Sequence, residues 1–236
     1  MGGVSNSGEN YGWSVLQNPW ALHIAAGSMT FWAGTINGLA TVALVFGRVS
    51  HMSGRIIDQA PTLFYNPPQS LFVSTLLLGF FIGTMMGAVA LPRLKLTGAL
   101  TAAMLPIVVA MILVSMGIYG TSAGSYTPAR FLLAFLLPLG MGMQNSITSQ
   151  TRIGRTTHMT GDMTDLGISV AKGNWERVRY LGLKYVAFFC GGLAGYLGSR
   201  LSPALTLFLG VAGIIVTAYC LQHWDSCERR SAVTPT

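Results

Sequence analysis

Long apolar segments alternate with short polar connections along most of the chain. Six of these segments reach the length of about 20 residues that a helix needs to cross the hydrocarbon core of a bilayer. Pro92, Pro128 and Pro203 lie at or near segment ends, where the missing proline N–H matters least. Pro106 and Pro138 predict kinks inside two segments. The pattern predicts an all-α membrane protein with six transmembrane helices at about 21–47, 71–92, 97–119, 130–148, 181–200 and 203–222.

The two longest connections, residues 48–70 and 149–180, each carry a copy of the same polar motif. The sequence S-H-M-S-G at 50–54 returns as T-H-M-T-G at 157–161, at an offset of 107. An aspartate stands seven positions after each histidine. Polar and ionisable groups are costly near a membrane, so this duplicated motif is the first place to look for function.

The repetition extends beyond the motif. Asn37 recurs as Asn145 at an offset of 108, and F-F-x-G-x-x-x-G occurs at 80–87 and again at 188–195. Because each copy holds three spans, an odd number, the second copy must enter the membrane upside down. We therefore expect two inverted three-helix repeats, with short broken or re-entrant helices after spans one and four. The expected parts are an N-terminal interfacial segment (1–20), the first repeat (21–119), a linker (120–129), the second repeat (130–222) and a cytoplasmic tail (223–236).

The composition agrees with a lipid environment and excludes two other classes of protein. Hydrophobic residues make up 51% of the chain and charged residues only 9%, whereas a soluble domain carries roughly a quarter charged residues. The net charge of +7 could suggest nucleic-acid binding. The basic residues lie in the connections between apolar segments, however, where they set membrane orientation, so no nucleic-acid partner is expected.

The basic residues also predict the orientation. Ten of them lie on the side that holds both termini and four on the opposite side. Positive charge accumulates in cytoplasmic connections, so both termini are expected in the cytoplasm. The ten are Arg93, Lys95, Arg152, Arg155, Lys172, Arg177, Arg179, Lys184, Arg229 and Arg230, and the four are Arg48, Arg55, Arg130 and Arg200.

The motif allows two chemical interpretations. In the first, Ser53 and Thr160 are helix N-caps, Gly54 and Gly161 permit the break, and a short helix follows each. The exposed N–H groups and positive dipole end of such a helix bind anions. In the second, the helix is unbroken, and each histidine shares a face with its aspartate as a proton relay or cation site. The candidate substrate- or ion-binding residues are His51, Asp58, His158, Asp165, Asn37, Asn145, Arg48 and Arg155.

Simpler roles remain open for all of these residues. The polar turn could end a membrane helix and satisfy its last carbonyls, and the asparagines could hydrogen-bond between helices rather than contact a substrate. Glycines at four-residue spacing predict faces where helix backbones approach closely. These packing candidates are Gly79, Gly83, Gly87, Gly191 and Gly195.

Cofactors, metals and catalysis receive little support. Cys190, Cys220 and Cys227 show no C-x-x-C spacing, and no cofactor or metal site is expected. The H-M pairs and 12 methionines leave a copper role as a minor alternative. The sequence contains no H-E-x-x-H and no phosphate-cradling G-x-x-x-x-G-K-[ST] loop, so an enzyme is not expected.

The chain resembles the YoaK-like family of bacterial membrane proteins, a family of unknown function. The resemblance rests on residues 34–54 with their H-M-S-G, and on G-M-Q-N at 142–145 followed by T-T-H-M-T-G at 156–161. It spans about 20–222 and departs at Arg55, where a polar, uncharged residue is expected. The resemblance implies a six-span, multi-pass protein of the bacterial inner membrane and brings no substrate.

The leading functional hypothesis is a small secondary transporter or permease. Its polar His/Asp site would lie between inverted repeats, and proton-coupled transport of a small anion is one form of this hypothesis. The expected partners are the lipid bilayer and a small-molecule or ion substrate. The alternative is a non-transporting scaffold that binds lipid or a protein partner, for example as a homodimer packed through its glycine faces.

Overall fold

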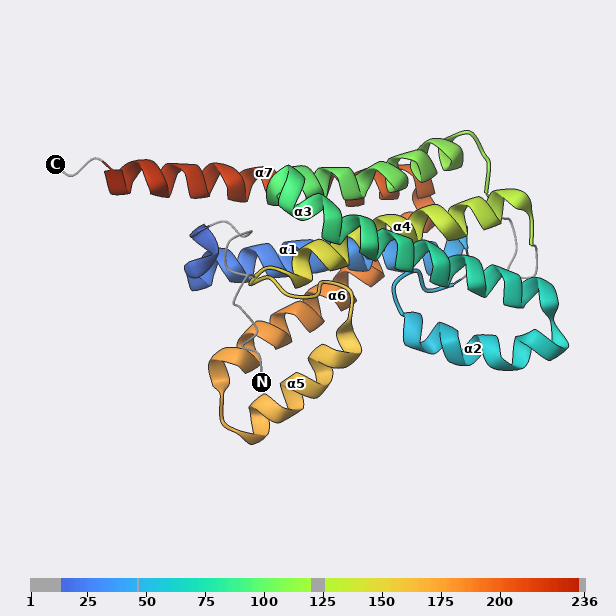
Figure 1. Ribbon diagram of the computed structural model, residues 1–236, viewed down its shortest axis with the longest axis horizontal. Helices are drawn as coiled ribbons and strands as arrows, with labels where there is room; N and C mark the ends of the chain where they lie inside the picture. Colours follow the sequence, from blue (N-terminus) through green and yellow to red (C-terminus); the bar gives the residue numbers. More distant parts are fainter. Residues whose placement is uncertain (1–13, 46, 120–125, 234–236) are drawn as a thin grey trace.

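The computed structural model describes residues 14–45, 47–119 and 126–233. All secondary-structure elements in this part of the chain are helices, and it contains no strands (Figure 1). Parts of the expected N-terminal segment, linker and tail lie outside the described residues, including Tyr11 and Trp13. The elements are η2 (Ser14–Gln17), α1 (Pro19–Leu39), the π-helical turn η3 (Ala40–Leu44), α2 (Met52–Tyr65), α3 (Pro67–Ser115), α4 (Pro128–Ser149), α5 (Met159–Ala171), α6 (Trp175–Leu201) and α7 (Pro203–Val233).

Local sequence explains where the long helices begin. Prolines open α1, α3, α4 and α7, because a proline at the first turn loses no hydrogen bond and has the right φ angle. A polar side chain also accepts a hydrogen bond from a first-turn N–H in five helices. These caps are Asn18 in α1, Asn66 in α3, Thr127 in α4, Asn174 in α6 and Ser202 in α7.

Helix α3 consists of two arms. Its 49 residues would extend about 74 Å as one rod, more than twice the thickness of the hydrocarbon core. Lys95 interrupts the helix with φ 57° and ψ 178°, and the chain turns back there (Figure 1). The spans expected at 71–92 and 97–119 are therefore the two arms of α3.

Four helices are long and apolar enough to cross a membrane, namely α3, α4, α6 and α7 over Pro203–Cys227. Helix α1, with 21 residues, is not among them. Leu78, Phe81, Met85 and Val89 form an exposed apolar stripe along α3. Soluble proteins seldom expose such a continuous apolar surface, so these helices belong to a membrane protein.

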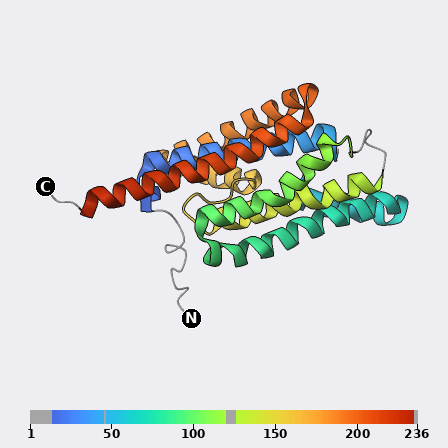
Figure 2. The same cartoon turned by 90° about the horizontal axis from the view of Figure 1, so that it is seen from above.

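The helices form two bundles that do not follow the order of the chain (Figure 2). Helix α1 packs against α6 and α7, while α4 packs against α3. The first helix of the first half (residues 21–119), α1, thus packs with helices of the second half (residues 130–222). In the same way α4, the first helix of the second half, packs with α3 of the first half. Helices α3 and α7 connect the two bundles.

The predicted packing glycines lie at the two contacts between the halves. Gly83 lies against the Leu139 carbonyl, and Gly191 lies against the Phe31 carbonyl. Both glycines and both carbonyl residues correspond at an offset of 108, and a Cβ atom at either glycine would overlap its carbonyl. The same offset relates two further contacts, so the α3–α4 and α1–α6 interfaces are built alike. These contacts are Gly34 with Phe188 and its equivalent Gly142 with Phe80, and Gly87 with Met143 and its equivalent Gly195 with Thr35.

We expect Gly83→Ala and Gly191→Ala to lower the free energy of unfolding by about 1–3 kcal/mol each, because the added methyl group pushes two helix backbones apart. Thermal unfolding in detergent measures the effect. Gly182→Ala on α6 is the matched control, since nothing lies within 4 Å of a Cβ there, and better helix propensity makes it neutral or stabilising. Equal melting temperatures for all three variants would contradict this account of the interfaces.

Candidate functional site

Both copies of the motif lie where a short helix begins. His51 precedes α2 with φ −99° and ψ 71°, and His158 precedes α5 with φ −98° and ψ 68°. The helices therefore begin two residues earlier than expected, and the prediction of Ser53 and Thr160 as N-caps is wrong. Residues 47–51 and 152–158 are not helical, so the chain is broken before each histidine rather than continuous through it.

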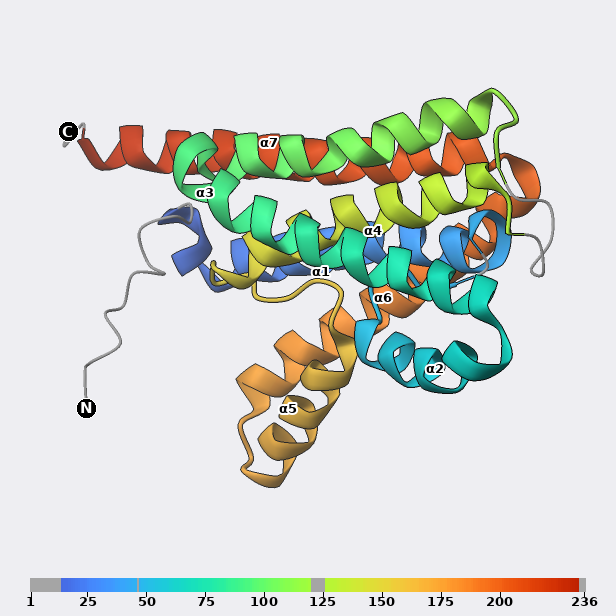
Figure 3. The ribbon, with the colours of Figure 1, turned by 45° about the vertical axis from the view of Figure 1, so that its right-hand side comes forward.

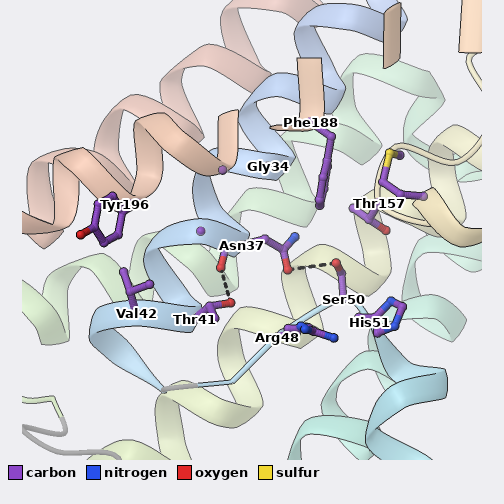
Figure 4. Close-up of a pocket in the computed structure, with 13 residues that line it drawn as sticks. Gly34, Asn37, Thr41, Val42, Arg48, Ser50, His51, Thr157, Phe188 and Tyr196 are labelled. Atoms are coloured by element: carbon purple, nitrogen blue, oxygen red, sulfur yellow. Dashed lines mark hydrogen bonds between the residues drawn. The ribbon is translucent and has the colours of Figure 1, made fainter. Parts of the chain in front are cut away.

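The hydroxyl groups of the motif serve another purpose than capping. Ser50 Oγ donates to Asn37 Oδ1 at 3.0 Å (Figure 4). In the second half, Thr157 Oγ1 donates to Asn145 Oδ1, also at 3.0 Å. Each bond ties a non-helical segment back to the long helix that precedes it. The helix start is thus fixed by a tertiary hydrogen bond, which explains why capping preference misplaced it.

The glycine of each motif is required by the histidine ring. A Cβ atom at Gly54 would lie 2.9 Å from Cδ2 of His51, and one at Gly161 would lie 2.8 Å from Cδ2 of His158. The imidazole therefore packs directly over the first turn of its own helix. The sequence predicted that Gly54 and Gly161 break the helix. They lie inside α2 and α5 instead and provide room for this ring.

The two copies of the motif meet at one cavity of about 340 Å³ beside α1 and α6. His51 lines it from the first half, and Thr157 and Met159, which flank His158, line it from the second. Figures 1 and 3 show α2 and α5 starting near the middle of the molecule and running apart. Asn37 also lines the cavity, so its side chain both accepts the hydrogen bond from Ser50 and can be reached from the cavity (Figure 4).

Burial and positive charge act together on His51. Its pKa lies below the ordinary value of 6.5, first because burial penalises the charged imidazole and second because Arg48 is positive. His158 and Arg55 lower it further, while Asp58 opposes them. The neutral imidazole is therefore favoured.

Two further cavities adjoin the motif copies, one in each half. The first, of about 340 Å³, is lined by Arg48 and Asp58 together with His51, and the second, of about 590 Å³, by Arg155 and Asp165. His158 does not line the second cavity. Most lining positions correspond at an offset of 107 or 108: Thr41 with Ser149, Gly47 with Gly154, Arg48 with Arg155, Gly54 with Gly161, Arg55 with Asp162 and Asp58 with Asp165.

The candidate aspartates make exposed ion pairs at these cavities. Asp58 Oδ2 lies 3.2 Å from Nη1 of Arg55, and Asp165 Oδ2 lies 3.9 Å from Nη2 of Arg177. Both carboxylates are about half exposed. Asp58 and His51 share a cavity, as the common-face interpretation expects, although the helix begins between them.

Comparison with protein families decides the assignment. The family model described as "Protein of unknown function (DUF1275)" matches residues 25–220. The chain belongs to this family. The YoaK-like resemblance seen in the sequence is thereby confirmed. Comparison with curated proteins and with solved structures gives no match.

The region shared with the DUF1275 family also contains a buried ion pair that the sequence interpretation missed. Lys184 Nζ donates to Asp162 Oδ2, and the two side chains are only 2% and 13% exposed. From sequence, Lys184 counted as a charge at a membrane edge, but it lies inside α6 and faces the second cavity. Its position within an apolar segment was the available signal.

A second missed feature concerns the carbonyls where α1 and α4 give way to the non-helical segments. Arg130 donates to the Val45 carbonyl at 2.7 and 3.1 Å and stacks over Phe72 at 4.4 Å. In the second half Tyr180, which corresponds to Phe72 at an offset of 108, donates its hydroxyl to the Ile153 carbonyl instead. Two different donors therefore satisfy equivalent backbone groups.

Metal binding finds no support in the described part of the chain. No three His, Cys, Asp or Glu side chains there lie close enough to hold a metal ion. Cys190 and Cys220 are exposed on helix surfaces and form no disulfide. The cavities are lined instead by cationic, carboxylate, amide and hydroxyl groups, together with apolar side chains in the shared cavity.

We expect Arg48→Gln to raise the pKa of His51, because among the neighbouring positive charges Arg48 opposes protonation most strongly. Histidine NMR titration in detergent measures the change, and the chain has only four histidines to assign. Arg93→Gln, an exposed arginine near the turn of α3, is the control and should leave the pKa of His51 unchanged. A pKa of His51 that responds equally to both substitutions would show that Arg48 does not act locally.

Proposed function

We propose that this protein is a small secondary transporter that carries an anionic solute through a site between two inverted halves. One observation carries the proposal: the two copies of a polar motif, repeated at an offset of 107, line a single cavity. If the motif were only a turn that ends a helix, its two copies would not have to lie close together. In a solute site between repeats they have to, because both halves must contact the same solute.

The proposed topology has six crossings. They are α1 continued by η3, the two arms of α3, and the helices α4, α6 and α7. The glycine contacts repeated at an offset of 108 support two halves of the same construction. Three crossings per half make the halves inverted. The charge distribution supports cytoplasmic termini, and the family resemblance implies a bacterial inner membrane.

The chemistry of the site favours an anion. Neither α2 nor α5 has a side chain capping its first turn, so N–H groups and the positive end of each helix dipole remain there. Arg48 and Arg155 stand a few residues before these helix starts. A carboxylate or oxyanion is the ligand that such a combination of donors and charge stabilises.

Alternating access follows from the paired construction. The cavity shared by the motif copies lies beside α1 and α6, and the equivalent position in the other half lies beside α4 and α3. If the halves exchange conformations, the first position closes as the second opens. The glycine contacts provide rigid bundles that can move as units.

The test is uptake by purified protein in liposomes, with nitrate, phosphate and malonate as trial anions and glycerol as a neutral control. We expect an anion gradient to drive uptake, and His51→Leu to lower it at least tenfold because it removes a polar wall of the site. His158→Leu should lower uptake as well, because it alters the turn that presents Thr157 and Met159 to the same cavity. Ser226→Ala, on the exposed end of α7, is the control.

Melting temperatures of the same variants separate transport from the scaffold alternative. A transporter keeps its fold while uptake falls. If no trial anion is carried and the histidine variants lose stability alone, the motif is a structural helix end and the transport proposal is wrong.

The inverted topology makes a separate prediction. In a protein whose three cysteines are replaced by serine, Thr41→Cys and Ser149→Cys should react with an impermeant maleimide from opposite sides of the membrane, since the two positions are equivalent in the halves. Vesicles of defined orientation provide the measurement. Reaction of both cysteines from one side would contradict an inverted arrangement.

A further inference from the structure

The Asp162–Lys184 pair is the most deeply buried ion pair among the described residues. Lys184 lies within α6 and is 2% exposed, while Asp162 lies in the first turn of α5 and is 13% exposed. The pair joins the short helix that begins with the motif to the long helix that follows it. It also faces the cavity of about 590 Å³.

Positive charge exceeds negative charge around this cavity. Arg152, Arg155 and Arg177 line it together with Lys184, against the carboxylates of Asp162 and Asp165. Asp165 is about half exposed and is paired loosely with Arg177. The other titratable groups nearby are Tyr180, whose ring centre lies 5.7 Å from Lys184 Nζ, and His158, whose ring packs on Gly161.

The fold itself does not need this ion pair. In the first half Arg55 stands at the position of Asp162 and Leu76 at the position of Lys184, at offsets of 107 and 108. Leu76 is fully buried, and α2 still packs against α3 as α5 packs against α6. An apolar residue therefore suffices at this place, and the charges in the second half require another explanation.

A buried ammonium group keeps its proton only beside a negative partner. Removing one member of a buried pair leaves an uncompensated charge, which is far more costly than the pair itself. Of the two carboxylates on the cavity, Asp162 binds Lys184, whereas Asp165 is about half exposed and lies beside Arg177. An anion that enters from outside is the other partner that the cavity can offer Lys184. Whenever an anion takes this place, the displaced carboxylate must lose its charge or move into water.

We infer that Asp162 and a small anionic substrate alternate as the partner of Lys184, and that Asp162 binds one proton for each negative charge the substrate brings. The inference rests on the proposed transport function and adds its coupling. A proton from solution forms an O–H bond with an oxygen of Asp162, and that bond breaks again when the anion leaves. Lys184 stays protonated throughout, so the buried site keeps its net charge.

This exchange defines the class of substrate and the stoichiometry. The substrate carries a carboxylate or oxyanion group, and a monoanion is accompanied by one proton. Transport of a monoanion is then electroneutral, and a pH gradient drives it while a membrane potential does not. The proton site belongs to one half only, which fits a single proton per cycle.

Titration calorimetry of the full protein in detergent tests the inference, with nitrate and phosphate as probes. In the wild-type protein, nitrate affinity should fall about tenfold per pH unit between pH 6 and 8, and one proton should be taken up per nitrate bound. Asp162→Asn should bind nitrate with an affinity independent of pH and without proton uptake. Glu176→Gln, at an exposed carboxylate in the first turn of α6 that does not line this cavity, is the control and should retain the wild-type slope.

A double variant guards against loss of fold. Asp162→Asn combined with Lys184→Leu removes both charges and restores the leucine of the first half, so it should keep its melting temperature and bind nitrate at least 100-fold more weakly. If Asp162→Asn retains the pH slope, or if the double variant binds as the wild type does, the inference is wrong. Either of these two results leaves anion uptake in liposomes possible, so it would overturn the inference but not the transport proposal. Failure of uptake together with a normal pH slope in calorimetry would overturn the transport proposal alone.

Discussion

A helix that is interrupted in apolar surroundings leaves N–H and C=O groups that must find partners within the protein. The rest of this structure depends on how that constraint is met. In the interrupted segments, hydroxyl groups donate hydrogen bonds to Asn37 and Asn145. The Val45 carbonyl, which follows η3, accepts from Arg130, and the Ile153 carbonyl, which follows α4, accepts from Tyr180. Because these partners sit on long helices, the short helices that follow are held at fixed places against the bundles.

The sequence predicted those features that recur as identical residues at a fixed offset. The motif pair, the matched asparagines and the spaced glycines could be seen because the same letters return at an offset of 107 or 108. The packing is repeated even at positions where the residue types of the two halves differ. The T-shaped ring pair Phe72–Phe131 has its counterpart in Tyr180–His23, with centroids 5.6 and 5.5 Å apart, although both residues differ.

Other parts of the site could not be predicted, for physical reasons. Capping preference placed the helix starts at Ser53 and Thr160. The hydroxyl group about one turn earlier in each copy, on Ser50 or Thr157, instead donates to an asparagine 13 or 12 positions away. Lys184 and Arg130 were assigned to polar connections because charge suggests exposure. Their partners, Asp162 and the Val45 carbonyl, are distant in sequence, and only the folded chain brings them together.

The exchange of first helices between the two bundles has a consequence for biosynthesis. Helix α1 ends at Leu39, but its main partners α6 and α7 begin only at Trp175 and Pro203. The glycine face of α1 therefore stays without its partner while most of the chain is still being translated. The bundle of α3 and α4 can form first. The protein is thus completed from its middle outward, and a chain truncated before α6 leaves its first helix without a place to pack.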